Sequence, residues 1–434
     1  MIKETIWYSS VSKLNEVRKQ RVTAIAYYRL SKWLLSLLVC VCYACSVPRS
    51  SVSTTSHPAA ATINFQDKRE YGFNDHTVTF SNRFASARLN NVKQLNDSTF
   101  AVVVLPENSP INASPWYAFK LWASHKKNIY IHLTYPDSRH RYDPKVSYSG
   151  KSWTPVSGVK LNSAGNDASF KVEAGADTLI IAAQEIIDSS TAYRWIDSVA
   201  QKPFIKKQVI GQSILGKPII ALHTTESPGK KLVVVLSRQH PPEVTGFMAM
   251  QEFVKTVLAA TPLAEHFRKS YEVIMVPLIN PDGVDEGNWR HSTAGVDLNR
   301  DWTDFKQPET RAVKDYLLNV IAKQQAKAYF GIDFHSTYQD VFYINEDKNN
   351  EPTNLPGFTR RWLEAFEAAI PGFKANVRPS GNGGNVSKSW MGRVLKAEAL
   401  TYEVGDNTPR SALKQKGRVA AETMMELLLK EKML

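Results

Sequence analysis

A histidine and a glutamate three positions apart, His240 and Glu243, carry the first recognisable chemistry in this sequence. A neutral imidazole and a carboxylate are both ligands of divalent metal ions. The two prolines between them stiffen the turn on which they lie. The two side chains can therefore converge on one metal ion, for which a third ligand would have to come from elsewhere in the chain.

The segments on either side of this pair indicate a strand followed by a helix. Residues 231–236 form a continuous apolar, β-branched run, which is typical of a buried parallel strand. Residues 244–254 carry apolar side chains at helical spacing. His240 and Glu243 therefore lie on the turn from the end of a strand into a helix, and open α/β sheets bind ligands at that edge.

The same spacing recurs at His223 and Glu226, where it leads into the turn signal of residues 227–230 rather than into a helix. We interpret this second pair as a strand end followed by a solvated loop. The spacing alone carries little information without a strand before it and a helix after it.

Two more ionisable residues belong to predicted strands. His335 follows the apolar strand 328–334 at the same edge as His240, and it is our candidate for the third metal ligand. Glu403 lies within the apolar strand 400–404. Because burying an unpaired carboxylate is costly, Glu403 must meet a cation or transfer protons at a raised pKa.

A polar loop over residues 288–302 carries a third group of candidates, Arg290, Asn299 and Arg300. The sequence Asn280-Pro-Asp-Gly283, which predicts a turn, precedes it. A planar guanidinium suits bidentate recognition of a carboxylate, and a neighbouring asparagine adds directed donors. We therefore expect this loop to bind an anionic group.

The pattern of strands and helices divides the chain into regions. Short strand signals separated by turns run over residues 63–190, which predicts an all-β sandwich, followed by a helical connector at 191–206. Strand and helix patterns alternate over residues 207–434, which predicts an α/β domain with a mixed, largely parallel sheet flanked by helices. Its expected strands lie at residues 217–222, 231–236, 272–277, 328–334 and 400–404, and its expected helices at 246–259, 309–323, 359–369 and 418–430.

The composition is that of an ordinary globular protein, with 43% apolar residues, 22% charged residues and a net charge of +13. No block rich in lysine and arginine is interleaved with aromatic residues, so nucleic-acid binding is not expected. All three cysteines, Cys40, Cys42 and Cys45, precede the predicted domains. A metal site in those domains must therefore use histidines and carboxylates.

The first 45 residues are interpreted as an export segment. The apolar run 33–45 is short for a membrane span and fits a secretory signal. Its last four residues resemble the lipoprotein processing box, in which the final cysteine, here Cys45, is lipidated. We therefore expect a periplasmic or membrane-anchored protein that contacts the membrane only through this segment, followed by a flexible tether at 46–62. The long stretch before the run suggests a translation start at Val22.

Taken together, these motifs resemble those of zinc metallocarboxypeptidases of the carboxypeptidase A class. The segments His240–Glu243, Asn280–Arg290 and Ala294–Arg300 look most like the cytosolic-carboxypeptidase-like branch. Pro115–Lys120 resembles the β-sandwich that precedes the catalytic domain in that branch. The resemblance covers roughly residues 85–430.

The resemblance implies a hydrolase that removes the C-terminal residue from peptides or proteins. One Zn²⁺ per chain would be held by His240, Glu243 and His335, with an open fourth position. Glu403 would take the proton of the attacking water and return it to the leaving amine.

The resemblance also implies how the substrate is bound. Arg290 would stabilise the oxyanion, and Asn299 and Arg300 would bind the terminal carboxylate. In the carboxypeptidase A class the floor of the specificity pocket comes from a residue about fifteen positions before the catalytic glutamate, which is Lys388 here. A lysine there would favour acidic C-terminal residues, as in the cytosolic-like branch.

Two features depart from the family. The class has a mobile tyrosine about twenty residues before the catalytic glutamate, and the segment Arg378–Trp390 contains none. The branch is named for cytosolic members, whereas we expect this chain to be exported. Two other functions stay open: a zinc amidase or deacylase acting on acyl-amino acids or cell-wall peptides, and a non-catalytic peptide- or glycan-binding lipoprotein. The complete set of ligands, base and arginine argues against the last.

Overall fold

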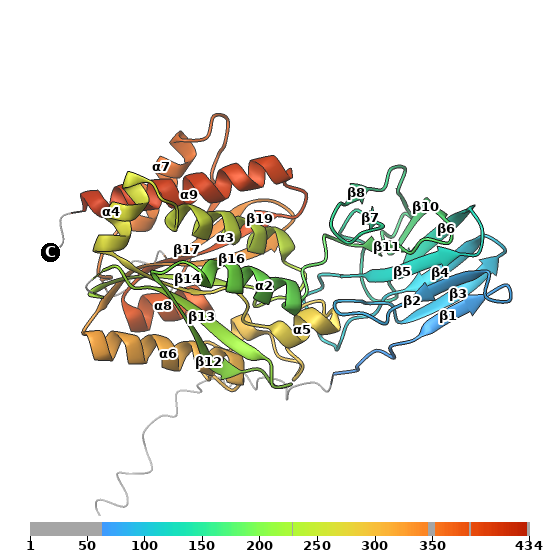
Figure 1. Ribbon diagram of the computed structural model, residues 1–434, viewed down its shortest axis with the longest axis horizontal. Coiled ribbons are helices and arrows are strands. Elements are labelled where there is room, and N and C mark those ends of the chain that lie inside the picture. Colours follow the sequence, from blue (N-terminus) through green and yellow to red (C-terminus); the bar gives the residue numbers. More distant parts are fainter. Residues whose placement is uncertain (1–62, 228, 346–351, 382, 432–434) are drawn as a thin grey trace, which may run out of the picture. The chain divides into compact units, whose positions relative to one another are not determined.

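The computed structural model describes residues 63–227, 229–345, 352–381 and 383–431 (Figure 1). These residues belong to one compact unit. The expected export segment and tether, residues 1–62, lie outside the described part of the chain. None of the helices in that part has the length and apolar character that crossing a bilayer requires.

Residues 70–182 form two β-sheets that share one core, and we call them the β-rich region. One sheet has the order β1 (Glu70–Phe73), β2 (Val78–Ser81), β5 (Ala118–Ala123), β11 (Leu179–Ala182), β7 (Lys145–Ser147) and β8 (Thr154–Pro155). The other has the order β3 (Asn91–Asn96), β4 (Thr99–Val103), β6 (Lys127–Thr134), β10 (Asp167–Ala174) and β9 (Lys160–Leu161). Alternate residues of β6, namely Ile129, Ile131 and Leu133, are buried in a core that both sheets supply, as expected of a half-buried strand.

The second part of the chain forms an eight-stranded sheet. Its order is β12 (Ile205–Gln212), β13 (Pro218–Thr224), β15 (Glu272–Val276), β14 (Lys231–Ser237), β16 (Lys327–Thr337), β19 (Glu398–Gly405), β17 (Val341–Asn345) and β18 (Val377–Ser380). The central strands from β15 to β19 run parallel, and antiparallel pairs flank them. The central strands therefore end at one common edge. This sheet and the β-rich region before it confirm the predicted fold class.

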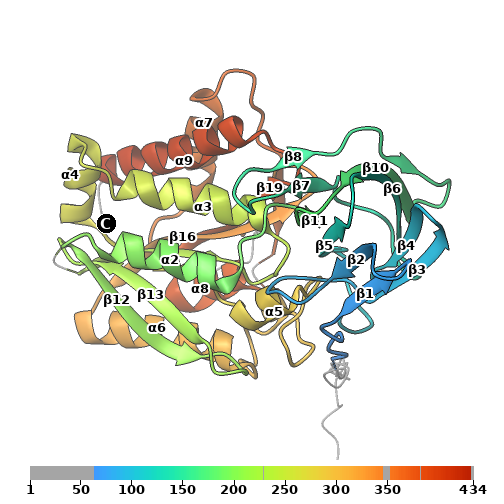
Figure 2. The same ribbon diagram turned by 45° about the vertical axis from the view of Figure 1, so that its right-hand side comes forward.

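Helices cover both faces of the large sheet (Figures 1 and 2). One core contains Val233 and Val235 of β14 together with α3 (Val244–Val257), α4 (Pro262–Ser270), α7 (Phe358–Ala368) and α9 (Arg410–Lys430). The opposite core contains Leu232 and Val234 together with α6 (Pro308–Gln324) and α8 (Ser387–Leu395). Successive strand residues point to opposite faces. A strand between two helical layers is therefore apolar throughout, which explains its unbroken apolar run.

Some local predictions are wrong. The turn expected at Asn280–Gly283 begins helix α5 (Pro281–Glu286), because Asn280 accepts a hydrogen bond from the Gly283 amide (3.0 Å) and a proline suits the first turn. Strand β18 was not predicted, since it is largely exposed and contains a proline. Helix α2 (Ser189–Ala200) begins before the expected connector. The expected domain boundaries stay predictions.

Gly246 provides a test of how closely α3 must approach β16. A Cβ added at Gly246 would lie 2.3 Å from the carbonyl oxygen of His335, so Gly246→Ala must push the helix away from the strand. Glu243 directly precedes this helix. We expect the variant to lose metal affinity and about 1–3 kcal/mol of unfolding free energy.

Metal content and denaturant unfolding measure these two effects. The matched control is Gly175→Ala, whose Cβ would meet its nearest neighbour, the Lys126 Cα, at 3.9 Å. Full metal content in Gly246→Ala would show that the helix–strand spacing does not position the ligands.

Candidate active site

The three predicted metal ligands come together near the ends of β14 and β16. All three are buried, and their ligand atoms lie within 4.8 Å of one another. Nδ1 of His240 is 2.8 Å from Oε1 of Glu243, and Nδ1 of His335 is 2.7 Å from Oε2. The two Nδ1 atoms are 3.2 Å apart. The turn after β14 and the end of β16 thus place one carboxylate and two imidazoles around a common point.

Two further carboxylates contact the imidazole rings at Nε2, the nitrogen that does not face Glu243. Nε2 of His240 lies 2.9 Å from Asp297 Oδ1, and Nε2 of His335 lies 2.9 Å from Asp333 Oδ2. When Nε2 donates to these carboxylate oxygens, Nδ1 of each ring is the nitrogen left to bind a metal ion. Both histidines are therefore set to bind a metal ion through Nδ1.

The carboxylates of this cluster favour the binding of a cation. Burial would raise the pKa of Glu243, but His240 and His335 hold it well below its usual value. Burial would likewise raise the pKa of Asp297, which His240 and Arg290 hold well below the usual range. Two imidazoles therefore lie among carboxylates, and both Nδ1 atoms face the oxygens of Glu243. A divalent cation between these groups would supply positive charge to the carboxylates, and two imidazoles with one glutamate are a ligand set that zinc takes.

Glu403 lies beside the cluster on β19, opposite His335 in the strand register. Its Oε2 atom is buried and has no hydrogen-bond partner in the part of the chain that the structure describes. Burial and the neighbouring Glu243 carboxylate raise the pKa of Glu403 to about 7, against the opposing effect of the nearby cationic groups. A carboxyl group with such a pKa can accept and return a proton near neutral pH.

The predicted anion-binding residues reach the same site from the loop that ends in η1 (Leu298–Arg300). Nε of Arg290 donates to Asp297 Oδ2 (2.7 Å). Burial would lower the pKa of Arg290, but the Asp297 and Glu243 carboxylates raise it, so the guanidinium stays charged. Asn299 accepts from the Ser387 amide (2.9 Å), while the Arg300 side chain is 55% exposed and donates to the Asn299 carbonyl (2.7 Å).

These residues line a cavity of about 630 Å³ together with Lys388. Nζ of Lys388 donates to Asn345 Oδ1 (2.6 Å), and burial together with Arg393 lowers the pKa of Lys388 to about 8. The cationic side chains in the lining are Arg141, Arg290, Arg300 and Lys388. The cavity therefore suits a ligand with more than one negative charge. All of the predicted site residues meet in or beside this cavity.

Several residues of the site were missed from the sequence. Asp333 could have been noticed, because it precedes His335 by two positions on the same strand and therefore on the same face. Arg141 belongs to the β-rich region and donates to Asp406 (2.8 Å), 265 positions away, so no local signal points to it. Two tyrosines, Tyr338 and Tyr343, line the cavity, although neither lies in the segment where the family's tyrosine was sought.

The second histidine–glutamate pair has separate partners. His223 is buried on β13 and pairs with Glu272, whereas Glu226 pairs with Arg268 (2.5 Å). His223 lies at the end of β13 and Glu226 in the exposed loop after it, as expected, and the strand buries the His223 side chain.

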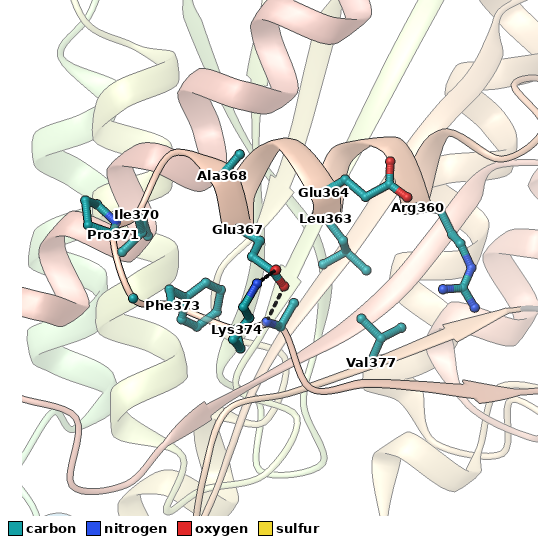
Figure 3. Close-up of a pocket in the computed structure, with 12 residues that line it drawn as sticks. Arg360, Leu363, Glu364, Glu367, Ala368, Ile370, Pro371, Phe373, Lys374 and Val377 are labelled. Atoms are coloured by element: carbon teal, nitrogen blue, oxygen red, sulfur yellow. Dashed lines mark hydrogen bonds and ion pairs between the residues drawn. The ribbon is translucent and has the colours of Figure 1, made fainter.

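Another cavity, of about 550 Å³, lies between the end of α7 and the segment leading to β18 (Figure 3). Its charged lining residues are Arg360, Glu364, Glu367 and Lys374. Glu367 pairs with Lys374 and accepts from the Ala375 amide (2.9 Å). None of the candidate metal ligands lines it, and neither does Glu403. The chemistry described above therefore belongs to the cavity beside Glu403.

Comparison with known proteins identifies the family. Residues 192–408 match the zinc carboxypeptidase family Peptidase_M14, and this chain belongs to that family. Its metal cofactor is accordingly zinc, which the buried group of His240, Glu243 and His335 could hold.

Relatives include cytosolic carboxypeptidase 3 of Mus musculus, 24% identical over 308 residues, which are 63% of this chain and 31% of that protein. Cytosolic carboxypeptidase 6 of Caenorhabditis elegans is 25% identical over 230 residues, which are 48% of this chain and 49% of that protein. The matched segments thus span between about a third and a half of the length of these relatives.

Solved structures establish the fold independently. A metallo-carboxypeptidase from Burkholderia cenocepacia is 21% identical with a TM-score of 0.66, covering 81% of this chain and 99% of that chain. A metallo-carboxypeptidase from Pseudomonas aeruginosa is 19% identical with a TM-score of 0.65, covering 80% of this chain and 98% of that chain. Both similarities extend over most of the described residues, so the shared fold includes more than the large sheet.

The expected export to the periplasm is wrong. The relatives carry the name cytosolic carboxypeptidase, which points away from a lipoprotein that is processed at Cys45 and anchored to a membrane. That expectation rested on a short apolar run and on its resemblance to a lipoprotein processing box, and neither pattern is specific to exported proteins. The run itself lies outside the described residues.

We expect Asp333→Asn to weaken zinc binding about 10- to 100-fold, the usual effect of removing the carboxylate behind a ligating histidine. The physical reason is that an amide no longer fixes the proton on Nε2 of His335. Competition with a chromogenic chelator measures the affinity. Asp304→Asn, a change of the same type at a more exposed position, is the control. Equal affinities in both variants would contradict the assigned role of Asp333.

Proposed function

We propose that this chain is a zinc-dependent metallocarboxypeptidase that hydrolyses the C-terminal peptide bond of peptides or proteins. The observation that carries the proposal is the placement of Glu403, a half-buried residue whose Oε2 atom is buried without a hydrogen-bond partner among the described residues, beside the buried His-Glu-His group. Membership of the zinc carboxypeptidase family supports the same activity. Since the chain spans only part of its curated relatives, their activity enters here as part of the proposal.

The proposed chemistry divides between two residues and the metal. Zinc, when bound, acidifies a water molecule and polarises the scissile carbonyl. Glu403 accepts the proton of that water and passes it to the leaving amine, for which its pKa of about 7 is suited. Arg290, kept charged by Asp297, stabilises the negative charge that develops on the carbonyl oxygen.

Recognition of the free C-terminus is assigned to Asn299 and Arg300. Arg300 is partly exposed at the cavity, so its guanidinium is accessible to a bidentate carboxylate. Asn299 is held by the Ser387 amide beside it. An uncharged C-terminal amide would lack this interaction, and we therefore expect amidated peptides to be poor substrates.

A preference for acidic C-terminal side chains is assigned to Lys388. This lysine is buried in the cavity wall, and its described hydrogen bond is to the neutral Asn345 side chain. A substrate carboxylate would supply the opposite charge, whereas a leucine would leave the ammonium without one and a lysine would repel it.

The experiment that tests the activity is mass spectrometry of a peptide library, incubated with and without a metal chelator. We expect loss of single C-terminal residues, which the chelator prevents. Acyl-amino acids in the same mixture distinguish an amidase. Release of acyl groups without trimming of peptides would contradict the proposed function.

We expect Glu403→Gln to keep its zinc and to lose turnover by about a hundredfold or more, because an amide cannot accept the water proton. Metal content and hydrolysis rate are measured on the same preparation. Glu422→Gln, a change of the same type on the exposed part of α9, is the control. Near-normal hydrolysis by the Glu403 variant would contradict its role as the base.

The selectivity for glutamate over leucine at the C-terminus should depend on pH. The pKa of Lys388 is lowered to about 8, so the lysine is charged below this pH and loses its charge above it. The ratio of kcat/KM for the two peptides should therefore fall between about pH 7 and about pH 9.5, since kcat/KM reports ionisations of the free enzyme. Titration of Glu403 affects both peptides and cancels in the ratio.

In Lys388→Met the ratio should be low and independent of pH. A wild-type enzyme that prefers leucine or lysine would contradict the assignment of Lys388 to selectivity. So would a variant that keeps the preference for glutamate.

A further inference from the structure

One carboxylate of the β-rich region holds the backbone of the loop that carries Arg290. Glu107 follows β4 and is fully buried. It accepts hydrogen bonds from three successive backbone amides, those of Trp289 (2.7 Å), Arg290 (3.0 Å) and His291 (2.7 Å). Three consecutive amides directed at one carboxylate fix the path of the chain at the point where the Arg290 side chain begins.

Neighbours of Glu107 reinforce this contact. Asn108 Oδ1 lies 2.6 Å from Nδ1 of His291, and Arg88 donates to the Gly287 carbonyl and to Asn288 Oδ1, both at 2.8 Å. Residues 287–291 are thus bonded to the β-rich region along their whole length. The catalytic loop is therefore shaped from outside the large sheet.

The opposite end of Arg290 is held by Asp297, whose Oδ2 accepts from Nε at 2.7 Å. Asp297 Oδ1 in turn contacts Nε2 of the metal ligand His240. Arg290 is consequently held at two points: Glu107 holds its backbone, and Asp297 holds its guanidinium group. Its position relative to the metal site depends on both carboxylates.

We propose that Glu107 is a positioning residue for Arg290, so that the β-rich region contributes to stabilisation of the transition state. A buried carboxylate with three charge-assisted hydrogen bonds is a rigid support, and a displacement of about 1 Å at a catalytic group can cost a hundredfold in rate. This inference rests on the proposed hydrolysis of peptides.

A double-mutant cycle separates positioning from mere attachment of the two regions. We expect Glu107→Gln to lower kcat about tenfold to a hundredfold, with KM and zinc content nearly unchanged. In an Arg290→Ala background the same change should cost less than about twofold, because the group that Glu107 positions is already absent. Losses that multiply would overturn the proposal, as would loss of zinc in Glu107→Gln.

Glu185→Gln is the matched control. Glu185 follows β11, and its Oε2 atom lies 2.6 Å from Nη2 of Arg410 in α9. Neither residue lines the cavity. The Glu185→Gln variant therefore removes a carboxylate contact to the α/β part of the chain without touching the Arg290 loop. We expect its kcat to stay within about twofold of the wild type.

Two further measurements keep the test decisive. If Glu107→Gln does not fold, Glu107→Asp replaces it in the double-mutant cycle. The shorter aspartate side chain should draw the loop away from its position, so that kcat falls when Arg290 is present and stays nearly the same when Arg290 is replaced by alanine. The affinity for a phosphonate peptide, measured by calorimetry, gives the cycle a readout without turnover. A wild type that hydrolyses no peptide would contradict the proposed function, whereas additive losses of phosphonate affinity would contradict the role of Glu107.

Discussion

The structure depends on one electrostatic constraint: two imidazole nitrogens and both oxygens of Glu243 must face one another in a buried site. The two Nδ1 atoms lie 3.2 Å apart. This arrangement persists because each ring is held at its other nitrogen by a carboxylate, Asp297 or Asp333. Neighbouring parallel strands set the positions of the rings, so that the two histidines and Glu243 together would hold a zinc ion.

Asp297 connects the constraint to the rest of the active site. Its carboxylate contacts Nε2 of His240 and Nε of Arg290, and it also accepts from the Asn299 amide (2.9 Å). One side chain thereby orients a metal ligand, the arginine assigned to the oxyanion and the loop assigned to the substrate carboxylate. Because these partners neutralise it, Asp297 remains ionised although it is buried, and its pKa lies well below the usual value.

The grouping of the three proposed metal ligands could be predicted from the sequence because strand ends and a following helix are local patterns. His240, Glu243 and His335 all lie where an apolar run stops, at the edge that parallel strands share. Arg141 and Glu107 could not be predicted, because each acts on residues that lie more than a hundred positions away. The helix at Pro281–Glu286 was mistaken for a turn, since its capping asparagine and proline are also turn residues.

The β-rich region is therefore part of the catalytic cavity. On one wall Arg141 pairs with Asp406 and donates to the carbonyl of Ser336, the residue after the metal ligand His335. Burial raises the pKa of Asp406 to about 6 even though Arg141 opposes this shift, so without Arg141 the carboxylate would be costly to keep in place. At the Arg290 loop the amides of residues 289–291 are buried against Glu107 and would otherwise lack an acceptor. Both sets of contacts exist only when the two parts of the chain lie together.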